Sequence, residues 1–134
     1  MTITRINPSE LHETPGYHHV TVVASGRLAF VAGQCPLDPS GALVGQGDVE
    51  AQVDQVAANA ATALAAAGAL PEHVVRTVIY VVGDDRAVLA AVWRRFGRSP
   101  IAGAFTTAST LLGVTRLGFP GQLVELDLTA ALTG

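Results

Sequence analysis

The run of residues 74–82 most constrains what this chain can fold into. Nearly every side chain in it is apolar and most are β-branched, and Arg76 and the hydroxyl-bearing Thr77 are the exceptions. A run of this length and composition is typical of a strand that is buried on both faces. The sequence therefore predicts a sheet with residues 74–82 at its centre.

Amphipathic helices are predicted before and after this strand. Asp48 is a good N-cap, because its carboxylate can accept the free backbone N–H groups of a first turn. An apolar stripe then follows at spacings of three and four, formed by Val49, Val53, Val56, Ala60 and Leu64. Gly68 supplies the C-terminal stop, and a short helical turn is expected at Pro71–His73. A second helix, capped by Asp84 or Asp85, would bury Val88, Leu89, Val92, Trp93 and Phe96.

Four further strands complete the expected fold. Residues 17–24 and Arg27–Gln34 flank the turn dipeptide Ser25-Gly26, which predicts a β-hairpin. Residues 105–114 and 122–130 are the last two strands, giving the order β-β-α-β-α-β-β. Two helices cannot cover both faces of such a sheet, so we expect both on one face of an α+β domain.

The last strand indicates what the other face carries. Side chains alternate along a strand, which directs Val124, Leu126 and Leu128 towards the helices. The opposite face then receives Leu123, Glu125, Asp127 and Thr129. A mixed face of apolar and acidic residues is commonly an oligomer interface lined with pockets.

Composition narrows the functional class. The 134 residues suit one domain, and a single cysteine allows no internal disulfide. The net charge is −3, and all eight basic residues are Arg. The densest basic patch of the chain is interpreted as a solvated helix C-terminus, and it consists of Arg94, Arg95 and Arg98. With no signal peptide and no membrane-length apolar run, we expect a single cytoplasmic domain without nucleic-acid or membrane partners.

Four segments in order carry a family resemblance. They are GYHHV at 16–20, FVAGQCPLD at 30–38, AGA at 67–69 and LVELD at 123–127. The ordered set resembles the Rid/YjgF family of reactive-intermediate deaminases over almost the entire chain. The resemblance implies a chorismate-mutase-like fold and a homotrimer with a barrel-like core of sheets and sites in clefts between subunits.

The resemblance also implies a chemistry. The best-known members hydrolyse reactive imines and enamines to ketones and ammonia. A strand Arg clamps the substrate carboxylate, while a Glu near the C-terminus and backbone groups around the GQ segment position the water. This sequence departs from that pattern, because Ser109 stands where the Arg of a Pro-Ala-Arg-Ser run belongs. The alignment is anchored by residues 113–117, and Arg116 lies seven residues too far on to replace the clamp.

Asp127 falls on the family's functional acidic position and shares a face with Glu125, ~7 Å along the strand. Both are candidate catalytic carboxylates, and the alternative is a pair of carboxylates bonded across an interface. Tyr17 matches the family's cleft tyrosine, which favours a place in the site over the alternative of an amphipathic edge residue. The candidate ligand contacts are Tyr17, Gly33, Gln34, Ser109 and Trp93.

His18 and His19 are adjacent on a predicted strand, so they point to opposite faces and cannot share a metal comfortably. One of them is a candidate for the cleft. Cys35 lacks an obvious activating base, so we interpret it as a small packed hydrophobe. No zinc pattern, phosphate loop or nucleophile elbow is present, and no cofactor is expected.

Two functions remain open from sequence. One is an imine or enamine hydrolase acting on a substrate other than small 2-imino acids, since a neutral Ser cannot make the bidentate contact that Arg makes with a carboxylate. The other is a non-catalytic small-molecule-binding or regulatory trimer. Chorismate mutase itself ranks low because few positive groups lie on the predicted strands, and ribonuclease activity ranks low because the chain is acidic.

Overall fold

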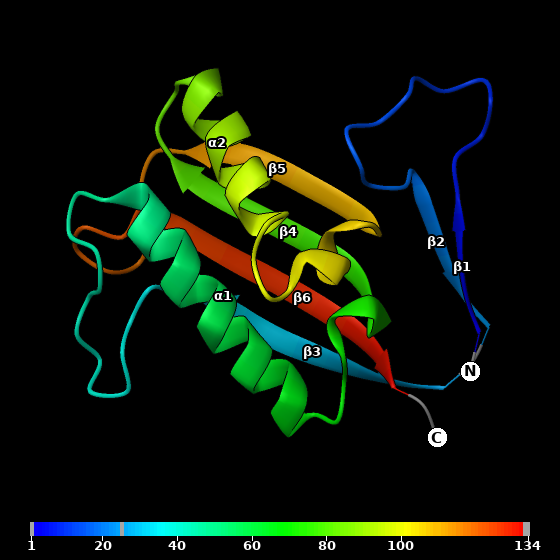
Figure 1. Cartoon of the computed structure of the whole chain (residues 1–134), viewed down its shortest axis with the longest axis horizontal. Coiled ribbons are helices and arrows are strands. Elements are labelled where there is room, and N and C mark those ends of the chain that lie inside the picture. Colours follow the sequence, from blue (N-terminus) through cyan, green and yellow to red (C-terminus); the bar gives the residue numbers. More distant parts are fainter. Residues whose placement is uncertain (1, 25, 133–134) are drawn as a thin grey trace.

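The structure is a computed structural model that describes residues 2–24 and 26–132. Figure 1 shows its elements in chain order, which are β1 (Ile3–Ile6), β2 (Val20–Val23), β3 (Arg27–Gln34), α1 (Val49–Ala66), β4 (Val74–Val82), α2 (Arg86–Phe96), β5 (Ala108–Val114) and β6 (Val124–Leu132). Short 3₁₀ turns occupy Pro71–His73 and Ala102–Phe105.

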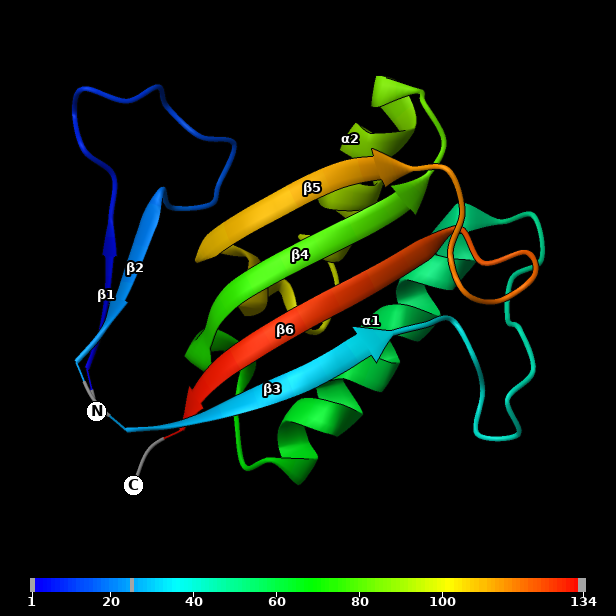
Figure 2. The same cartoon turned by 180° about the vertical axis from the view of Figure 1, so that it is seen from behind.

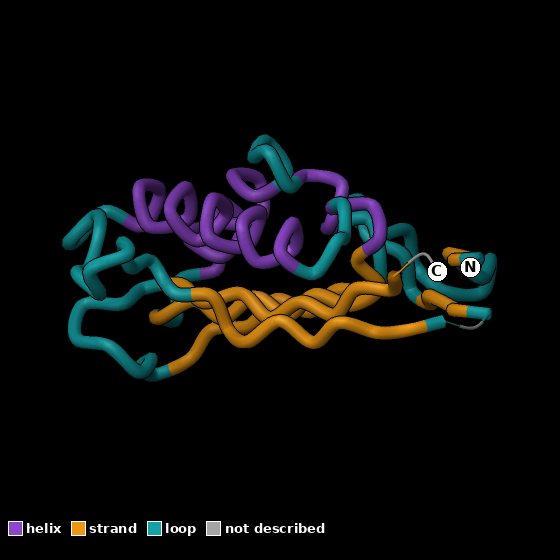
Figure 3. The backbone as a smooth tube through the Cα atoms, turned by 90° about the horizontal axis from the view of Figure 1, so that it is seen from below, coloured by secondary structure: helices purple, strands orange, loops and turns teal. Residues whose placement is uncertain are grey.

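The main sheet has four strands in the order β3-β6-β4-β5. Strand β6 is antiparallel to both of its neighbours, whereas β4 and β5 run parallel, with Thr77 opposite Ser109. The end view in Figure 3 shows both helices as one layer on a single face of this sheet. This arrangement confirms the predicted α+β fold, with 74–82 as an interior strand.

The core lies between the helix layer and the sheet. The Asp48 carboxylate accepts the Ala51 N–H at 3.1 Å and begins α1 as predicted. Asp85 does the same for α2, accepting the Ala87 N–H at 2.8 Å. The α1 stripe is fully buried except at Val49, which is partly buried, whereas α2 buries completely only Val92 and Phe96. The other apolar residues of α2 stay half-exposed beside the β5 edge, which leaves room for a cavity.

The predicted hairpin between 17–24 and Arg27–Gln34 is wrong. Strand β2 pairs instead with β1, a strand that the sequence reasoning missed, and neither belongs to the main sheet. Figure 2 shows this N-terminal arm, residues 2–24, at the end of the sheet where β5 begins. Long-range contacts hold it there: the His18 N–H donates to the Thr107 carbonyl at 3.3 Å. Ser25, half of the expected turn, lies outside the described residues.

Strand boundaries differ modestly from the expectation. The predicted strand 105–114 begins only at Ala108, because residues 102–105 form a 3₁₀ turn. The last strand runs to Leu132, two residues beyond the predicted end. The strand expected at 17–24 shrinks to Val20–Val23, which places Tyr17 in the loop before it.

The face of the sheet opposite the helices is mixed, as its alternation predicts. Glu125 and Asp127 lie on it, and Phe30, which faces Thr129 across β3 and β6, is 78% exposed. Leu28 on the same strand is 46% exposed. Within the described chain, β3 pairs only with β6, so its other edge carries no strand. We call this surface the open face.

Candidate functional site

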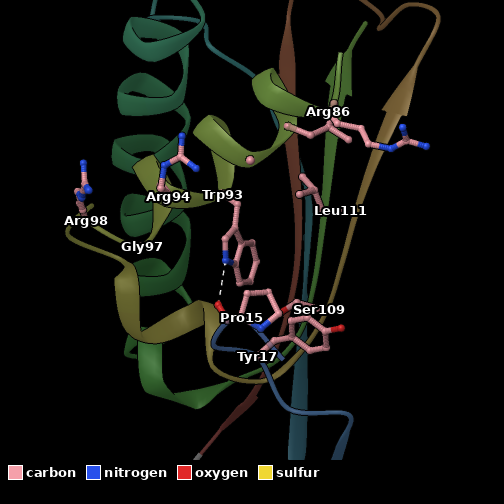
Figure 4. Close-up of a pocket in the computed structure, with 11 residues that line it drawn as sticks. Pro15, Tyr17, Arg86, Trp93, Arg94, Gly97, Arg98, Ser109 and Leu111 are labelled. Atoms are coloured by element: carbon pink, nitrogen blue, oxygen red, sulfur yellow. Dashed lines mark hydrogen bonds between the residues drawn. The ribbon is translucent and has the colours of Figure 1, made fainter. Parts of the chain in front are cut away.

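A cavity of about 790 Å³ lies between α2, β5 and the N-terminal arm. Ligand sites of small molecules typically occupy roughly 300–1,000 Å³, so it is large enough for more than a three-carbon acid. Figure 4 shows its lining, which comprises Pro15, Tyr17, Arg86, Leu89, Ala90, Trp93, Arg94, Gly97, Arg98, Ser109 and Leu111.

Trp93 forms an aromatic wall with the arm. Its indole Nε1–H donates to the Pro15 carbonyl at 3.2 Å, so the ring meets the cavity with no unpaired donor. The Tyr17 ring lies 6.2 Å from it and the Phe105 ring 5.9 Å, both edge to face. Such contacts fix a ring's orientation. The wall therefore depends on the arm staying docked.

Ser109 points to the helix side of β5 and borders the cavity. Its hydroxyl accepts a hydrogen bond from Thr77 Oγ1 at 2.6 Å and donates to the Thr107 carbonyl at 3.0 Å. These bonds hold the hydroxyl to the sheet, and it carries no charge. No Asp or Glu is among the cavity's lining residues in the described chain.

The two candidate carboxylates lie on the opposite, open face. A Cβ built on Gly33 would come within 2.5 Å of Glu125 Oε2 and 3.1 Å of Asp127 Oδ1. Both carboxylates thus lie against the same backbone, and only glycine leaves them space. The Tyr80 hydroxyl donates to Asp127 Oδ2 at 3.1 Å. Partial burial, and then this bond, raise the pKa of Tyr80.

Glu125 is held by two donors. Cys35 Sγ donates to its Oε1 at 3.3 Å, and Gln122 Nε2 donates to the same oxygen at 3.2 Å. Burial, together with the bond to Glu125 and its negative charge, raises the pKa of the Cys35 thiol to about 11. A thiol in this environment is a poor nucleophile at neutral pH.

The sequence-predicted site residues therefore form two groups rather than one. Tyr17, Trp93 and Ser109 meet in the cavity, whereas Glu125 and Asp127 lie behind the sheet with Gly33. The strand separates them because successive side chains point to opposite faces. Gln34 ends β3 with its side-chain amide donating back to the Ala32 carbonyl at 3.0 Å. Within one chain, the cavity residues and the two carboxylates therefore do not form a single site.

Neither histidine of the adjacent pair lines the cavity. The His18 ring bonds the Thr106 carbonyl, and His19 Nε2 lies 2.9 Å from the His12 carbonyl. Across the described ranges 2–24 and 26–132, no three His, Cys, Asp or Glu residues gather in a way that could hold a metal ion. The same ranges contain no helix long and apolar enough to cross a membrane.

The sequence reasoning missed the cavity's arginines. Arg86, Arg94 and Arg98 all border it. The sequence pattern favours a solvated helix end for the patch at 94–98, and Arg95 does lie apart, with Nε and Nη2 bonded to Asp54 at 2.9 and 2.7 Å. The available signal was the spacing of four residues from 86 through 90 and 94 to 98, which places these positions on one stripe.

Comparison with known proteins identifies the family. A family model described as "Endoribonuclease L-PSP" matches residues 9–132. Protein DfrA of Myxococcus xanthus is 38% identical over 116 residues, covering 85% of this chain and 83% of the relative. A RutC family protein of Synechocystis is 32% identical over 134 residues, covering 98% of both.

Solved structures agree with this. The crystal structure of YyfB from Yersinia pestis, a conserved Rid family protein of unknown function, has a TM-score of 0.89 at 38% identity, covering 98% of this chain and all of that one. A Mycobacterium tuberculosis member of the YjgF/YER057c/UK114 family has a TM-score of 0.64 at 29% identity, with 98% and 100% coverage. The matches span the whole fold, arm included, and the chain belongs to the Rid/YjgF/RutC family.

Proposed function

We propose that this protein is a homotrimer that binds a small molecule in the cavity of Tyr17, Trp93 and Ser109. The neighbouring subunit's open face would complete the site by bringing its Glu125 and Asp127 to the cavity. The bound molecule would be an imine or enamine, hydrolysed to a carbonyl compound and ammonia. The observation that carries this proposal is the meeting of three separately predicted residues at one cavity.

The chemistry requires little from the protein beyond orientation and a base. Water adds to the carbon of a protonated C=N bond, and one water proton passes to a carboxylate. The resulting carboxylic acid returns this proton to the carbinolamine nitrogen, the C–N bond breaks with loss of ammonia, and the hydroxyl group loses its proton to the departing ammonia as the C=O bond forms, which gives the carbonyl compound and ammonium. Neither Glu125 nor Asp127 forms an ion pair with a described residue, so no protein cation competes with water for either carboxylate. General-base help of this kind typically contributes about 10²–10⁴-fold.

The alternative is a non-catalytic binding or regulatory trimer. One feature of the cavity's lining favours this alternative. The lining includes the neutral Ser109 but no carboxylate, so it could hold a ligand without activating a water molecule. The two functions share a binding site and differ in the fate of the bound molecule.

An ammonia-release assay separates them. An amino-acid oxidase generates 2-iminopropionate or bulkier imino acids in place, and the rate of their hydrolysis is compared with and without the protein. We expect acceleration for a bulkier imine, with a loss of at least about 100-fold in Asp127→Asn or Glu125→Gln. Binding without acceleration of any imine would assign the non-catalytic function.

A further inference from the structure

The cavity has an apolar body and a cationic rim. Its inner surface is formed by Leu89, Ala90, Trp93 and Leu111, with Pro15 and Tyr17 from the arm. In the view of Figure 4, the Trp93 ring lies between Arg86 on one side and Arg94 with Arg98 on the other. The guanidinium groups belong to exposed residues, whereas Trp93, Leu89 and Leu111 are half-buried.

The side chains of these three arginines have no partner in the part of the chain that the structure describes. None of their guanidinium groups makes a hydrogen bond or an ion pair with another described residue, in contrast to Arg95, which bridges to Asp54 and Glu50. Arg95 supplies the ion pairs between α2 and α1, so the packing of these two helices does not require Arg86, Arg94 or Arg98. Three uncompensated cations beside one apolar cavity, with no carboxylate in its lining, form a complementary surface for an anion.

We propose that the cavity selects an amphiphilic monoanion: an aromatic or branched apolar body against Trp93, with a carboxylate held at the rim by Arg94 and Arg98. The proposal rests on the cavity being the site of the proposed function, and it names the substrate class of that site. The clamp would come from α2 and the turn that follows it, because β5 offers only the neutral Ser109. A short acid such as pyruvate would meet the rim and leave the apolar walls unfilled.

Trp93 makes this directly measurable, because it is the only tryptophan in the chain. Its fluorescence is titrated with 4-phenylbutyrate, with the neutral, shape-matched 4-phenylbutanamide, and with pyruvate. We expect 4-phenylbutyrate to bind at least about tenfold more tightly than either of the others. Its affinity, unlike that of the amide, should weaken as salt is raised, since salt screens exposed charges.

Three variants locate the effect. The double change Arg94→Gln and Arg98→Gln should weaken 4-phenylbutyrate at least about tenfold and leave the amide unchanged. Arg116→Gln is the matched control, because Arg116 is also unpaired but borders a different surface hollow. Ala90→Phe should weaken the acid and the amide together by filling the cavity.

Equal binding of acid and amide would overturn the proposal, as would an acid affinity that survives loss of both arginines. Its failure is distinguishable from failure of the proposed function. If 4-phenylbutyrate binds as expected while no imine is hydrolysed, the proposed ligand selectivity is supported and the proposed imine hydrolysis is refuted. If imines are hydrolysed without preference for an apolar body, catalysis stands and the selectivity falls.

Discussion

The residue at position 109 determines the charge at the sheet side of the cavity. Ser109 is neutral and already bonded to Thr77 and Thr107. We predict that the native protein does not accelerate 2-iminopropionate hydrolysis, and that Ser109→Arg gains on the order of 10- to 100-fold, the equivalent of one charge-assisted bond. Ammonia release measures this. Ser109→Gln adds bulk without charge and should gain nothing, so an equal gain there would refute the clamp.

A second residue-scale prediction concerns Cys35, whose pKa is raised from 9.0 to about 11. Its reaction with iodoacetamide at pH 8 should be about a hundredfold slower than in the urea-unfolded chain. Glu125→Gln should accelerate it, because this change removes the negative charge that accepts the thiol's hydrogen bond and disfavours the thiolate. The folded chain holds this proton more tightly than the unfolded one, so the free energy of unfolding should fall as pH rises from about 9 to 11. Equal rates in both states would contradict the assignment.

At the scale of elements, long-range hydrogen bonds hold the N-terminal arm against the start of β5. Thr21 Oγ1 lies 2.5 Å from Thr107 Oγ1 and accepts the Ala108 N–H at 3.1 Å. Thr21→Val should cost about 1 kcal/mol of docking, shift Trp93 fluorescence to the red and speed proteolysis of the arm. Thr62→Val, which removes only a helix-surface bond to the Ala58 carbonyl, is the control. Identical proteolysis of the two variants would show that Thr21 does not anchor the arm.

Local sequence pattern was sufficient to predict the elements that need only an apolar surface to pack against, rather than particular partner residues. The apolar stripe of α1, its Asp48 cap and the strand β4 follow from spacing and side-chain type alone. The arm could not be predicted, because the Ser25-Gly26 signal concerns two neighbouring residues, whereas Thr21 finds its partners 86 and 87 positions away. Tertiary contacts of that range overrode the turn pattern.

Three residues of the candidate site could be named from the sequence, but their arrangement could not be predicted. Tyr17, Trp93 and Ser109 were each identified, and the structure brings them to one cavity. Sequence alone could not show that Glu125 and Asp127 lie on the other side of the sheet from it, because the side to which Ser109 points depends on the β4–β5 register. The arginine rim was missed for a similar reason: the side of α2 that meets β5 is a tertiary property.

At the scale of the whole molecule, the open face has the features of an association surface. Phe30 is 78% exposed beside a strand edge that no described strand covers, and unpaired edges with apolar side chains favour association. We predict a homotrimer of about 41 kDa, three times the chain mass of 13.8 kDa. Light scattering behind a sizing column checks this, and a stable species of one chain mass would defeat it.

Phe30→Glu tests both the interface and the division of the site between subunits. A carboxylate at this apolar contact cannot be buried without a partner, so the variant should elute as a monomer, whereas Leu70→Glu, on an exposed loop leucine beside the helix layer, should not. Each monomer keeps its own arm, Trp93 and arginine rim, so 4-phenylbutyrate should still bind within about threefold of the native affinity. Imine hydrolysis should be lost, because Glu125 and Asp127 now face solvent behind their own sheet. A monomer that still hydrolyses imines would place the whole reaction within one chain, and one that loses the probe as well would make the cavity itself a product of assembly.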